Sequence, residues 1–407
     1  MELHKAKEIV TKLFGEEPAY PCKIRFWDNS ELSFGNGEPV FVLYFTNPAG
    51  FTAAITDPSL GFGESYMSGD IEVEGDLEKL IALSYIHDFP SKLSTKDKAR
   101  LCWWNFKDRY SLKQTRKDIQ AHYDRGNEFY KLWLDSGMNY SCAYFKHPDD
   151  SLEQAQQNKI AHSLNKLRIS PGHRLLDIGC GWGNVIIHAA KQFGVKAVGI
   201  TLSEEQYELA KKRIKQEGLE DKAEVRLQDY RELAETGEKF DRIISIGMFE
   251  HVGRENIPLF FKNAHSLLKD SGIMLLHTIC RMKPAETDPW LTTYIFPGGY
   301  IPAVGEITSA GYDARLLFLD AEDLRPHYYL TLGHWLKRFE KNLDKIKEMM
   351  DNQFIRMWRL YLTGCRASFR YGPMHVIQYL YAKGHDIRKW PLTRSWFYYS
   401  GTKTPTL

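Results

Sequence analysis

The sequence predicts an α/β protein in which a doubly wound, mostly parallel sheet follows a small N-terminal α/β domain. The first observation is a regular alternation of apolar, strand-like runs with helical periodicity between residues 150 and 280. The second is a glycine-rich turn directly after the first of these runs. The third is size, because 407 residues at about 150 per domain suggest two or three domains. With 43% hydrophobic and 26% charged residues, the composition is that of a globular protein and excludes a mainly disordered chain.

The first 90 residues predict a separate small module. Apolar residues at helical spacing indicate a helix over 2–14, and two apolar runs indicate strands at 22–28 and 40–45 with turn-forming residues between them. No cluster of catalytic side chains appears in this part. We therefore expect three regions, namely a small α/β domain at 1–90, a basic aromatic linker at 91–120 and a catalytic domain at 121–407.

Strands and helices alternate through the catalytic domain, which predicts a parallel sheet with right-handed crossovers and a ligand site beyond the carboxyl ends of its strands. Later elements are expected to complete the domain and to add helices over the active site, with strands at 314–320 and 376–382 and helices at 328–349 and 352–370. The alternating part is expected to have strands at 173–179, 195–200, 223–228, 241–247 and 272–279, and helices at 153–168, 184–193, 203–216 and 256–268.

Neither metal nor disulfide chemistry is indicated. The six cysteines are scattered, without a CxxC pair or a histidine at zinc spacing, so free thiols are expected. No stretch approaches the roughly 18 consecutive apolar residues of a membrane-spanning helix. The first residues, MELHKAKEIV, do not form a signal peptide, and a cytoplasmic protein is expected.

Charge is unevenly distributed although the net charge is only +2. From Lys92 to Asp118 there are nine Lys/Arg against three Asp/Glu, and from Arg325 to the end there are 15 against five. Basic residues mixed with aromatic rings suit anionic lipid headgroups, nucleic acid would attract the same charges, and a solvated helix face explains them equally well. The aromatic residues in the first region are Trp103, Trp104, Phe106 and Tyr110.

A glycine-rich turn follows the first strand of the predicted parallel sheet. It has the form D-x-G-x-G-x-G and opens a helix, where glycines let the backbone approach a ligand closely. The spacing differs from the GxGxxG of nicotinamide-binding folds and resembles motif I of class I S-adenosylmethionine-dependent methyltransferases. The expected cofactor residues in this turn are Asp177, Gly179, Gly181 and Gly183.

The next two strand ends supply further cofactor candidates. Thr201 and Leu202 end the second strand, and many members of the class have a carboxylate there for the ribose hydroxyls, which this chain lacks. Gln206, one helical turn later, could hydrogen-bond the ribose or could face solvent. After the third strand, where the class recognises adenine, Asp229 is an expected acceptor from the amino group, within the run Gln228, Asp229 and Tyr230.

Further segments resemble the cyclopropane-fatty-acid synthases and their relatives, the mycolic-acid cyclopropane synthases. The resemblance extends from about His122 to the C-terminus, and the 90-residue leader with its basic linker is similar to the longer, phospholipid-acting bacterial type. The segments are HYDRGN (122–127), MNYSCAYF (138–145), GMFEHVG (247–253), LLDIGCGWG, GITLS, LLHTI and YIFPGG.

The resemblance implies that a methyl group from S-adenosylmethionine adds to a cis double bond of a phospholipid acyl chain. The resulting carbocation loses a proton to a bound bicarbonate ion and closes to cyclopropane. Tyr140 and Ser141 would touch the cofactor, and backbone amides near Cys142 and Thr278 would assist in holding bicarbonate. Tyr328 is placed by its seven-residue step to Trp335, although Tyr329 lies beside it. The implied bicarbonate ligands are Cys142, Glu250, His277 and Tyr328.

The residues themselves support part of this assignment. Glu250 follows the fourth strand and His277 lies at the end of the fifth, so both are expected at the same edge of the sheet. Without the resemblance, His277 would be interpreted as a core histidine. Cys365 matches a suspected nucleophile of the family. An alkene attacking a sulfonium methyl needs no nucleophile, so we expect a pocket wall or core cysteine, with a catalytic role as the minor alternative. Segments 284–305 and 325–370 are expected to form an acyl tunnel.

The resemblance therefore implies a cytoplasmic cyclopropane-fatty-acyl-phospholipid synthase that associates peripherally with the inner face of the membrane. Its implied partners are an anionic phospholipid bilayer, unsaturated acyl chains and a second copy of the chain, with no nucleic acid. The nearest alternative is a fatty-acid methyltransferase that gives a methyl-branched or exomethylene chain. A lipid-binding module with a vestigial cofactor fold and a small-molecule methyltransferase are more distant alternatives.

Overall fold

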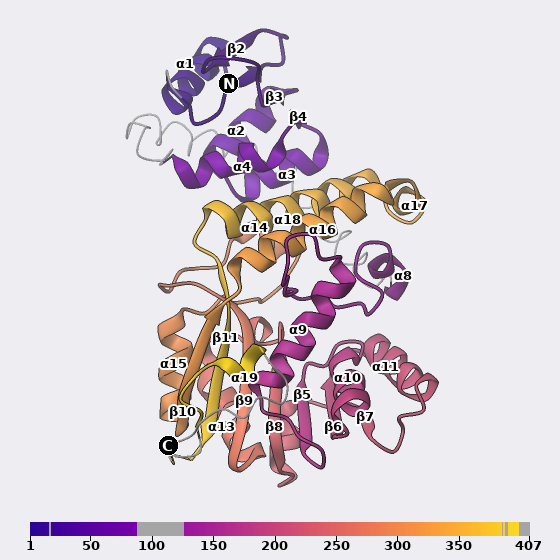
Figure 1. Ribbon diagram of the computed structural model, residues 1–407. Coiled ribbons are helices and arrows are strands. Elements are labelled where there is room, and N and C mark those ends of the chain that lie inside the picture. Colours follow the sequence, from indigo (N-terminus) through magenta and orange to yellow (C-terminus); the bar gives the residue numbers. More distant parts are fainter. Residues whose placement is uncertain (16–17, 88–125, 385, 387–389, 399–407) are drawn as a thin grey trace. The chain divides into compact units, whose positions relative to one another are not determined.

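The computed structural model describes residues 1–15, 18–87, 126–384, 386 and 390–398 (Figure 1). The predicted linker at 91–120 and Cys102 lie outside these residues. The chain forms two compact units, which we call the leader unit and the sheet unit. The leader unit comprises Met1–Arg125, Thr287–Pro297 and Leu332–Pro373, and the sheet unit comprises Gly126–Glu286, Gly298–Thr331 and Met374–Leu407.

A four-stranded mixed sheet organises the described part of the leader unit. β1 is antiparallel to β2 and parallel to β3, and β3 is antiparallel to β4. Alternate residues of β1 and β3 are buried, and α1 packs against them through Ile9, Val10 and Leu13. In spatial order the strands are β2 (Glu31–Phe34), β1 (Cys22–Arg25), β3 (Phe41–Phe45) and β4 (Ile71–Gly75), and the helix is α1 (Leu3–Phe14).

Helices complete this unit, and α18 packs against α3 and α4. The single helix predicted at 328–349 is wrong, because Asn342, at φ −102° and ψ 17°, leaves the helical conformation and separates α16 from α17. The helices are α2 (Pro48–Thr56), α3 (Leu60–Ser68), α4 (Leu77–Ile86), α14 (Pro289–Tyr294), the end of α16 (Arg325–Lys341), α17 (Leu343–Lys347) and α18 (Asn352–Tyr371).

The sheet unit has a seven-stranded sheet in the described residues. β5 to β9 run parallel, as predicted, whereas β11 is antiparallel to both β9 and β10. The predicted doubly wound, mostly parallel sheet is therefore confirmed. In spatial order the strands are β10 (Leu316–Asp323), β11 (His375–Lys383), β9 (Leu268–Cys280), β8 (Phe240–Ile246), β5 (Arg174–Ile178), β6 (Lys196–Thr201) and β7 (Ala223–Leu227).

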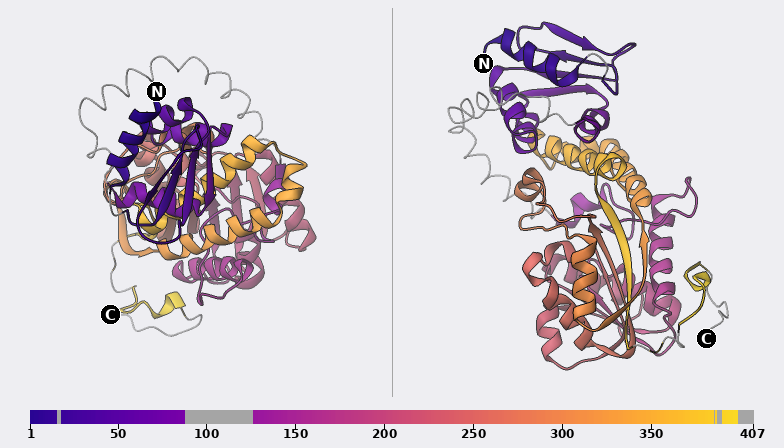
Figure 2. Two further views of the ribbon diagram at one scale, coloured as in Figure 1. Left: turned by 90° about the horizontal axis from the view of Figure 1, so that it is seen from above. Right: turned by 90° about the vertical axis from the view of Figure 1, so that its left-hand side faces the viewer.

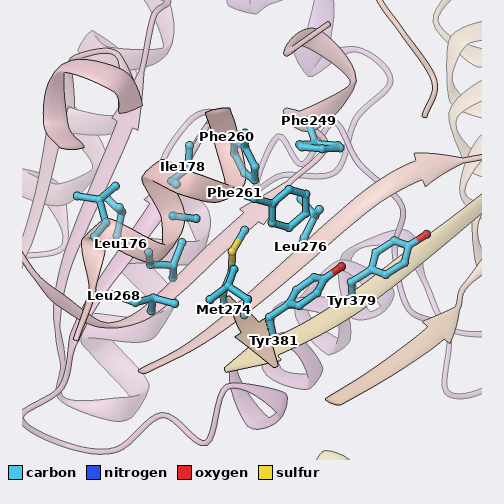
Figure 3. Close-up of a cluster of buried hydrophobic side chains, with 14 of the residues drawn as sticks. Leu176, Ile178, Phe249, Phe260, Phe261, Leu268, Met274, Leu276, Tyr379 and Tyr381 are labelled. Carbon is cyan, nitrogen blue, oxygen red and sulfur yellow. The ribbon is translucent and has the colours of Figure 1, made fainter. Parts of the chain in front are cut away.

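Helices cover both faces of this sheet (Figure 2). On one face, Phe260 and Phe261 of α13 pack with Met274 of β9 and Tyr381 of β11 (Figure 3). No helix in the described part of the chain is both long and apolar enough to cross a membrane. One face carries α12 (Tyr230–Glu235), α13 (Ile257–Leu267) and α15 (Val304–Asp313), and the other carries α9 (Leu152–Lys166), α10 (Asn184–Phe193), α11 (Glu204–Gln216) and α19 (Ser395–Tyr398).

Candidate active site

A cavity of about 550 Å³ lies in the sheet unit at the carboxyl ends of the parallel strands. Its walls come from the segments that directly follow β5, β6, β7 and β8, as expected for a doubly wound sheet. Except for Gly183, every residue that the sequence assigned to cofactor binding lines it. These residues are Tyr140, Ser141, Asp177, Gly179, Gly181, Thr201, Leu202, Gln206, Gln228, Asp229 and Tyr230.

The glycines of the turn after β5 serve different purposes. Gly179 has φ +82°, and a Cβ there would lie 2.6 Å from Cβ of Met248, which also lines the cavity. Gly181 has φ +53° with nothing within 4 Å of such a Cβ, so its backbone faces open space. At Gly183 a Cβ would lie 3.0 Å from Cβ of Ala210 on α11. Gly183 therefore brings two helices together and does not contact the cavity.

Asp177 places an acidic group at the floor of the cavity. Its side chain is only 1% exposed, and its Oδ2 has no hydrogen-bond partner among the described residues. Burial raises the pKa of Asp177 to about 7, an effect opposed by the charge of Lys159. Such an acceptor suits a ligand that brings a positively charged donor.

Lys159 of α9 is a site residue that the sequence analysis missed. It lines the cavity, is 1% exposed and donates from Nζ to Oγ of Ser141 at 2.9 Å. Burial lowers the pKa of Lys159 to about 8, while Asp135 and Asp177 act in the opposite direction. A signal was present, because Lys159 recurs with His162 and Lys166 at helical spacing on a face that also carries the apolar Leu152 and Ala155.

The ends of β6 and β7 provide hydrogen-bonding groups. Thr201 Oγ1 donates to Oε1 of Gln206 at 2.8 Å, which orients Gln206 within the cavity wall. Asp229 caps α12 by accepting from the Arg231 backbone N–H at 2.8 Å and also pairs with the Arg231 guanidinium at 2.6 Å. These contacts hold the pKa of Asp229 below its usual range. Arg231 therefore already occupies much of the hydrogen-bond acceptor capacity of Asp229 that the sequence assigned to adenine.

An aromatic group borders the cavity beside Ser141. The ring of Tyr140 lies 5.6 Å from that of Tyr130 and 5.4 Å from that of Trp133. Trp182 lies 5.4 Å from Tyr130 and donates from Nε1 to Oδ1 of Asn127 at 2.6 Å. Tyr140 and Trp182 line the cavity, so this group supplies an apolar wall next to the polar one.

Glu250 and His277 each have one buried polar atom without a partner. Glu250, in the short helix η1 (Phe249–His251) after β8, accepts from the Ile279 N–H at 2.7 Å through Oε1. Oε2 has no hydrogen-bond partner among the described residues, and burial raises the pKa of Glu250. His277 on β9 is 1% exposed, has Nδ1 at 3.2 Å from Nε2 of Gln378, and has no described partner at Nε2.

Cys142 and Tyr328 meet at one backbone carbonyl. The buried Cys142 thiol approaches the Leu324 carbonyl at 3.8 Å, and Tyr328, also buried, donates its backbone N–H to the same carbonyl at 3.1 Å. Burial raises the pKa of Cys142, so the thiol stays protonated at neutral pH. The amide of Ala143, next to Cys142, is already bound to Oγ1 of Thr331 at 3.0 Å.

The predicted catalytic residues do not line the 550 Å³ cavity themselves. Cys142, Glu250, His277 and Tyr328 belong to the sheet unit, and the first two adjoin residues that line the cavity. Cys365 lies on α18 in the leader unit. Burial raises the pKa of the Cys365 thiol to about 12, which disfavours the thiolate that a nucleophile requires.

Comparison with known families gives two matches. The family model described as "Mycolic acid cyclopropane synthetase" matches residues 110–379, and a domain of unknown function, DUF7884, matches residues 9–95. The chain is 36% identical over 382 residues to a "Probable fatty acid methyltransferase" of Pseudomonas putida, covering 91% of this chain and 95% of that protein. It is 36% identical over 353 residues to the cyclopropane-fatty-acyl-phospholipid synthase of Escherichia coli K12, covering 86% and 90%.

Solved structures agree with these matches. The cyclopropane synthase MmaA2 of Mycobacterium tuberculosis is 34% identical with a TM-score of 0.61, over 67% of this chain and 100% of that one. The mycolic acid cyclopropane synthase CmaA1, solved in complex with SAH and CTAB, has the same identity and TM-score over 66% and 98%. With its glycine turn and cavity in the positions described above, this chain belongs to the mycolic acid cyclopropane synthetase family and is an S-adenosylmethionine-dependent methyltransferase.

Proposed function

We propose that the enzyme transfers a methylene group from S-adenosylmethionine to the cis double bond of an unsaturated phospholipid acyl chain and forms a cyclopropane ring. We further propose that a bound bicarbonate ion removes the proton that ring closure releases. The observation that carries the proposal is the pair of unpartnered buried atoms, Oε2 of Glu250 and Nε2 of His277. The similarity to the phospholipid-acting enzyme of Escherichia coli supports the substrate class.

S-adenosylmethionine fits the 550 Å³ cavity by its chemistry. The unpartnered Oδ2 of Asp177 can accept from the ammonium group of its amino-acid portion, and the open backbone at Gly181 admits it closely. Gln206 and Gln228 offer amide groups to its hydroxyls and base. When bound, it supplies an electrophilic methyl group. Tyr140 and Trp182 give the surrounding wall the ring faces that stabilise positive charge.

Bicarbonate fits the two unpartnered atoms because it both donates and accepts hydrogen bonds. Oε2 of Glu250 can accept its proton, and an N–H at Nε2 of His277 can donate to its charged oxygen. Cys142 and Tyr328, which share the Leu324 carbonyl, would complete the site. When bound, bicarbonate supplies a small base.

The lipid also implies a location. We propose a cytoplasmic enzyme that binds the inner face of an anionic bilayer as a homodimer. Exposed lysines on α16 and α17 support attraction to anionic lipid. The arginines of α18 contribute less, because Arg356, Arg359 and Arg366 already pair with Glu72, Glu340 and Glu78.

A liposome assay tests the reaction. Incubation with S-adenosylmethionine and vesicles of cis-unsaturated phospholipid should yield acyl chains one CH₂ heavier that resist hydrogenation. Purging carbon dioxide and bicarbonate should abolish turnover, and added bicarbonate should restore it. Glu250→Gln should lower turnover by about 100-fold or more, because the bicarbonate that it holds would be lost and a positioned base usually contributes that much, while binding of S-adenosylhomocysteine persists. The exposed Glu255→Gln is the matched control. Full turnover of Glu250→Gln without bicarbonate would contradict the proposal.

The second candidate is a fatty-acid methyltransferase that stops at a methyl-branched or exomethylene chain. It is favoured by the relatives in Pseudomonas putida and Mycobacterium tuberculosis, both named probable fatty acid methyltransferases, at 36% and 34% identity. An exomethylene chain and a methyl-branched chain that keeps its double bond gain the same mass as a cyclopropane, but both take up hydrogen and show alkene resonances. Proton NMR of the extracted lipid therefore distinguishes both from a cyclopropane ring.

A further inference from the structure

Gln378 and His277 lie directly opposite each other on the antiparallel strands β11 and β9. Directly opposed residues point to the same face of a sheet, within reach of one another. Gln378 is 1% exposed and is flanked by Ile377 and Tyr379 in a strand that is otherwise largely apolar. A buried amide in such a strand requires hydrogen-bond partners to offset its loss of water.

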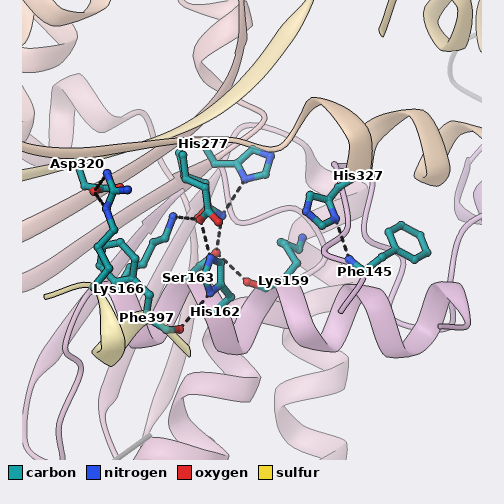
Figure 4. Close-up of polar contacts among 12 residues, drawn as sticks. Phe145, Lys159, His162, Ser163, Lys166, His277, Asp320, His327 and Phe397 are labelled. Atoms are coloured by element: carbon teal, nitrogen blue, oxygen red, sulfur yellow. Dashed lines mark hydrogen bonds and ion pairs between the residues drawn. The ribbon is translucent and has the colours of Figure 1, made fainter. Parts of the chain in front are cut away.

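The direction of the hydrogen bonds around Gln378 follows from one fixed acceptor. The Lys159 backbone carbonyl can only accept, so Ser163 donates its hydroxyl proton to it at 2.8 Å (Figure 4). The Ser163 oxygen can then only accept from Gln378, whose Nε2 lies 3.0 Å away. The amide nitrogen of Gln378, and not its oxygen, therefore faces this cluster.

The same nitrogen sets the protonation of the histidine. Nε2 of Gln378 lies 3.2 Å from Nδ1 of His277, so the second amide hydrogen points at Nδ1. Nδ1 must then be the unprotonated nitrogen of the ring. Burial and the charges of Lys159 and Lys166 hold the pKa of His277 well below its usual range, although Glu322 acts in the opposite direction. His277 is therefore neutral, with its proton on Nε2.

That proton lies on the buried nitrogen that has no partner among the described residues. The Nε2–H group is thus a donor that a ligand can use. His277 directly precedes Thr278 and Ile279, and the Ile279 N–H binds Glu250. A protonated Nδ1 would instead leave Nε2 as an acceptor, which would repel an anion. The tautomer decides whether the site can bind a small anion at all.

We propose that Gln378, anchored by Ser163, is a positioning residue that holds His277 in the Nε2–H tautomer and so presents a donor to the bound anion. This inference rests on the proposed function, because the anion is the bicarbonate assigned to Glu250 and His277. Neither Gln378 nor Ser163 lines the 550 Å³ cavity, so their effect is expected on anion binding and not on S-adenosylmethionine.

The test is ¹⁵N NMR of the histidine rings in the full chain, with His277 assigned by loss of its signals in His277→Gln. Wild type should show a protonated Nε2 and a bare Nδ1. Gln378→Glu, which offers only acceptors when ionised, should move the proton to Nδ1. Gln378→Met should give a mixture of tautomers and raise the bicarbonate concentration needed for half-maximal turnover by about tenfold or more, as for other outer partners of a liganding histidine.

Controls separate positioning from folding. Ser163→Ala removes the acceptor of the Gln378 amide without changing β11, and it should also shift the His277 proton from Nε2 toward Nδ1. This variant keeps the test valid if a Gln378 variant fails to fold. Tyr379→Phe removes a buried contact with Cys280 from the next position of β11, and should change neither tautomer nor bicarbonate requirement. A wild-type proton on Nδ1, or an unaltered tautomer in all three Gln378 and Ser163 variants, overturns the inference. The expected tautomer in a protein that makes no cyclopropane contradicts only the proposed function.

Discussion

The side chain of Lys159 controls the charge of the cofactor cavity. It is a buried ammonium group bound to Ser141, and it opposes the effect of burial on Asp177. An ionised Asp177 is needed to accept from a positively charged ligand group. With the pKa of Asp177 at about 7, ionisation increases as pH rises through neutrality, so ligand affinity should rise over the same interval.

Replacing Lys159 by Met should therefore weaken binding of S-adenosylhomocysteine by about tenfold at pH 7, the effect of losing one hydrogen bond to a charged group. The pKa of Asp177 should rise further in this variant. Because Asp177 ionises at higher pH, the difference in affinity between the variant and wild type should narrow toward pH 9. Isothermal titration calorimetry across this range measures both effects. Lys166→Met, two turns further along α9 and bound to Glu322, is the matched control and should bind within about twofold of wild type. Wild-type affinity in Lys159→Met at every pH would show that the ammonium has no role in the cavity.

The sequence predicted most of the residues around the cavity, because the glycine turn and the strand ends are local patterns. It did not predict Lys159, whose role depends on α9 packing across the sheet face, or the pairing of Asp229 with Arg231. Gln378 also escaped prediction, since it meets His277 only through the register of β11 with β9. The role of Gln378 depends on strand pairing that leaves no local pattern to detect, whereas Lys159 left the helical spacing with His162 and Lys166 described above.

At the scale of elements, the parallel strands, α1 and α18 were predicted well, whereas the helices between residues 48 and 86 were not. The segment 48–86 contains three helices that were not predicted, α2, α3 and α4, and α3 includes two glycines, which disfavour helix formation. Those glycines serve close packing: a Cβ at Gly61 would lie 2.2 Å from the Ala53 carbonyl oxygen, and one at Gly63 would lie 2.2 Å from Cδ1 of Trp290. Tertiary packing therefore outweighs the intrinsic helix propensity of α3.

Gly63→Ala should accordingly destabilise the protein by about 1 to 3 kcal/mol, the usual cost of overpacking, and lower the calorimetric unfolding temperature of the leader unit by several degrees. Gly364→Ala is the matched control within α18. Its Cβ would meet nothing closer than Cδ1 of Ile81 at 4.0 Å, so helix propensity should leave stability unchanged or raise it by up to about 1 kcal/mol. Equal unfolding temperatures for the two variants would show that Trp290 does not approach Gly63 this closely.

At the scale of the whole molecule, chain order and spatial grouping differ. Segments 287–297 and 332–373 fall in the same compact unit as the first 87 residues, although the sequence assigns them to the catalytic domain. The reason is non-local charge pairing and packing, since Arg356 and Arg366 of α18 pair with Glu72 and Glu78. The boundaries at 90 and 120 stay a prediction about independently folding domains.

The same pairing changes which basic residues can attract a bilayer. Three arginines of α18 are engaged, whereas Lys337, Lys341 and Lys345 on α16 and α17 are exposed. Replacing these three by Gln should weaken binding to anionic vesicles by about 3 kcal/mol, at about 1 kcal/mol per lysine, or roughly 100-fold at low salt. Vesicle cosedimentation measures this loss of affinity, and the difference from wild type should shrink in 0.5 M salt because exposed charges are screened.

The control replaces three exposed lysines of α11 by Gln, which changes the net charge equally. These lysines are Lys211, Lys212 and Lys215. Equal loss in both triple variants would mean that net charge alone governs binding, and no loss in either would show that membrane association does not depend on the lysines of α16 and α17.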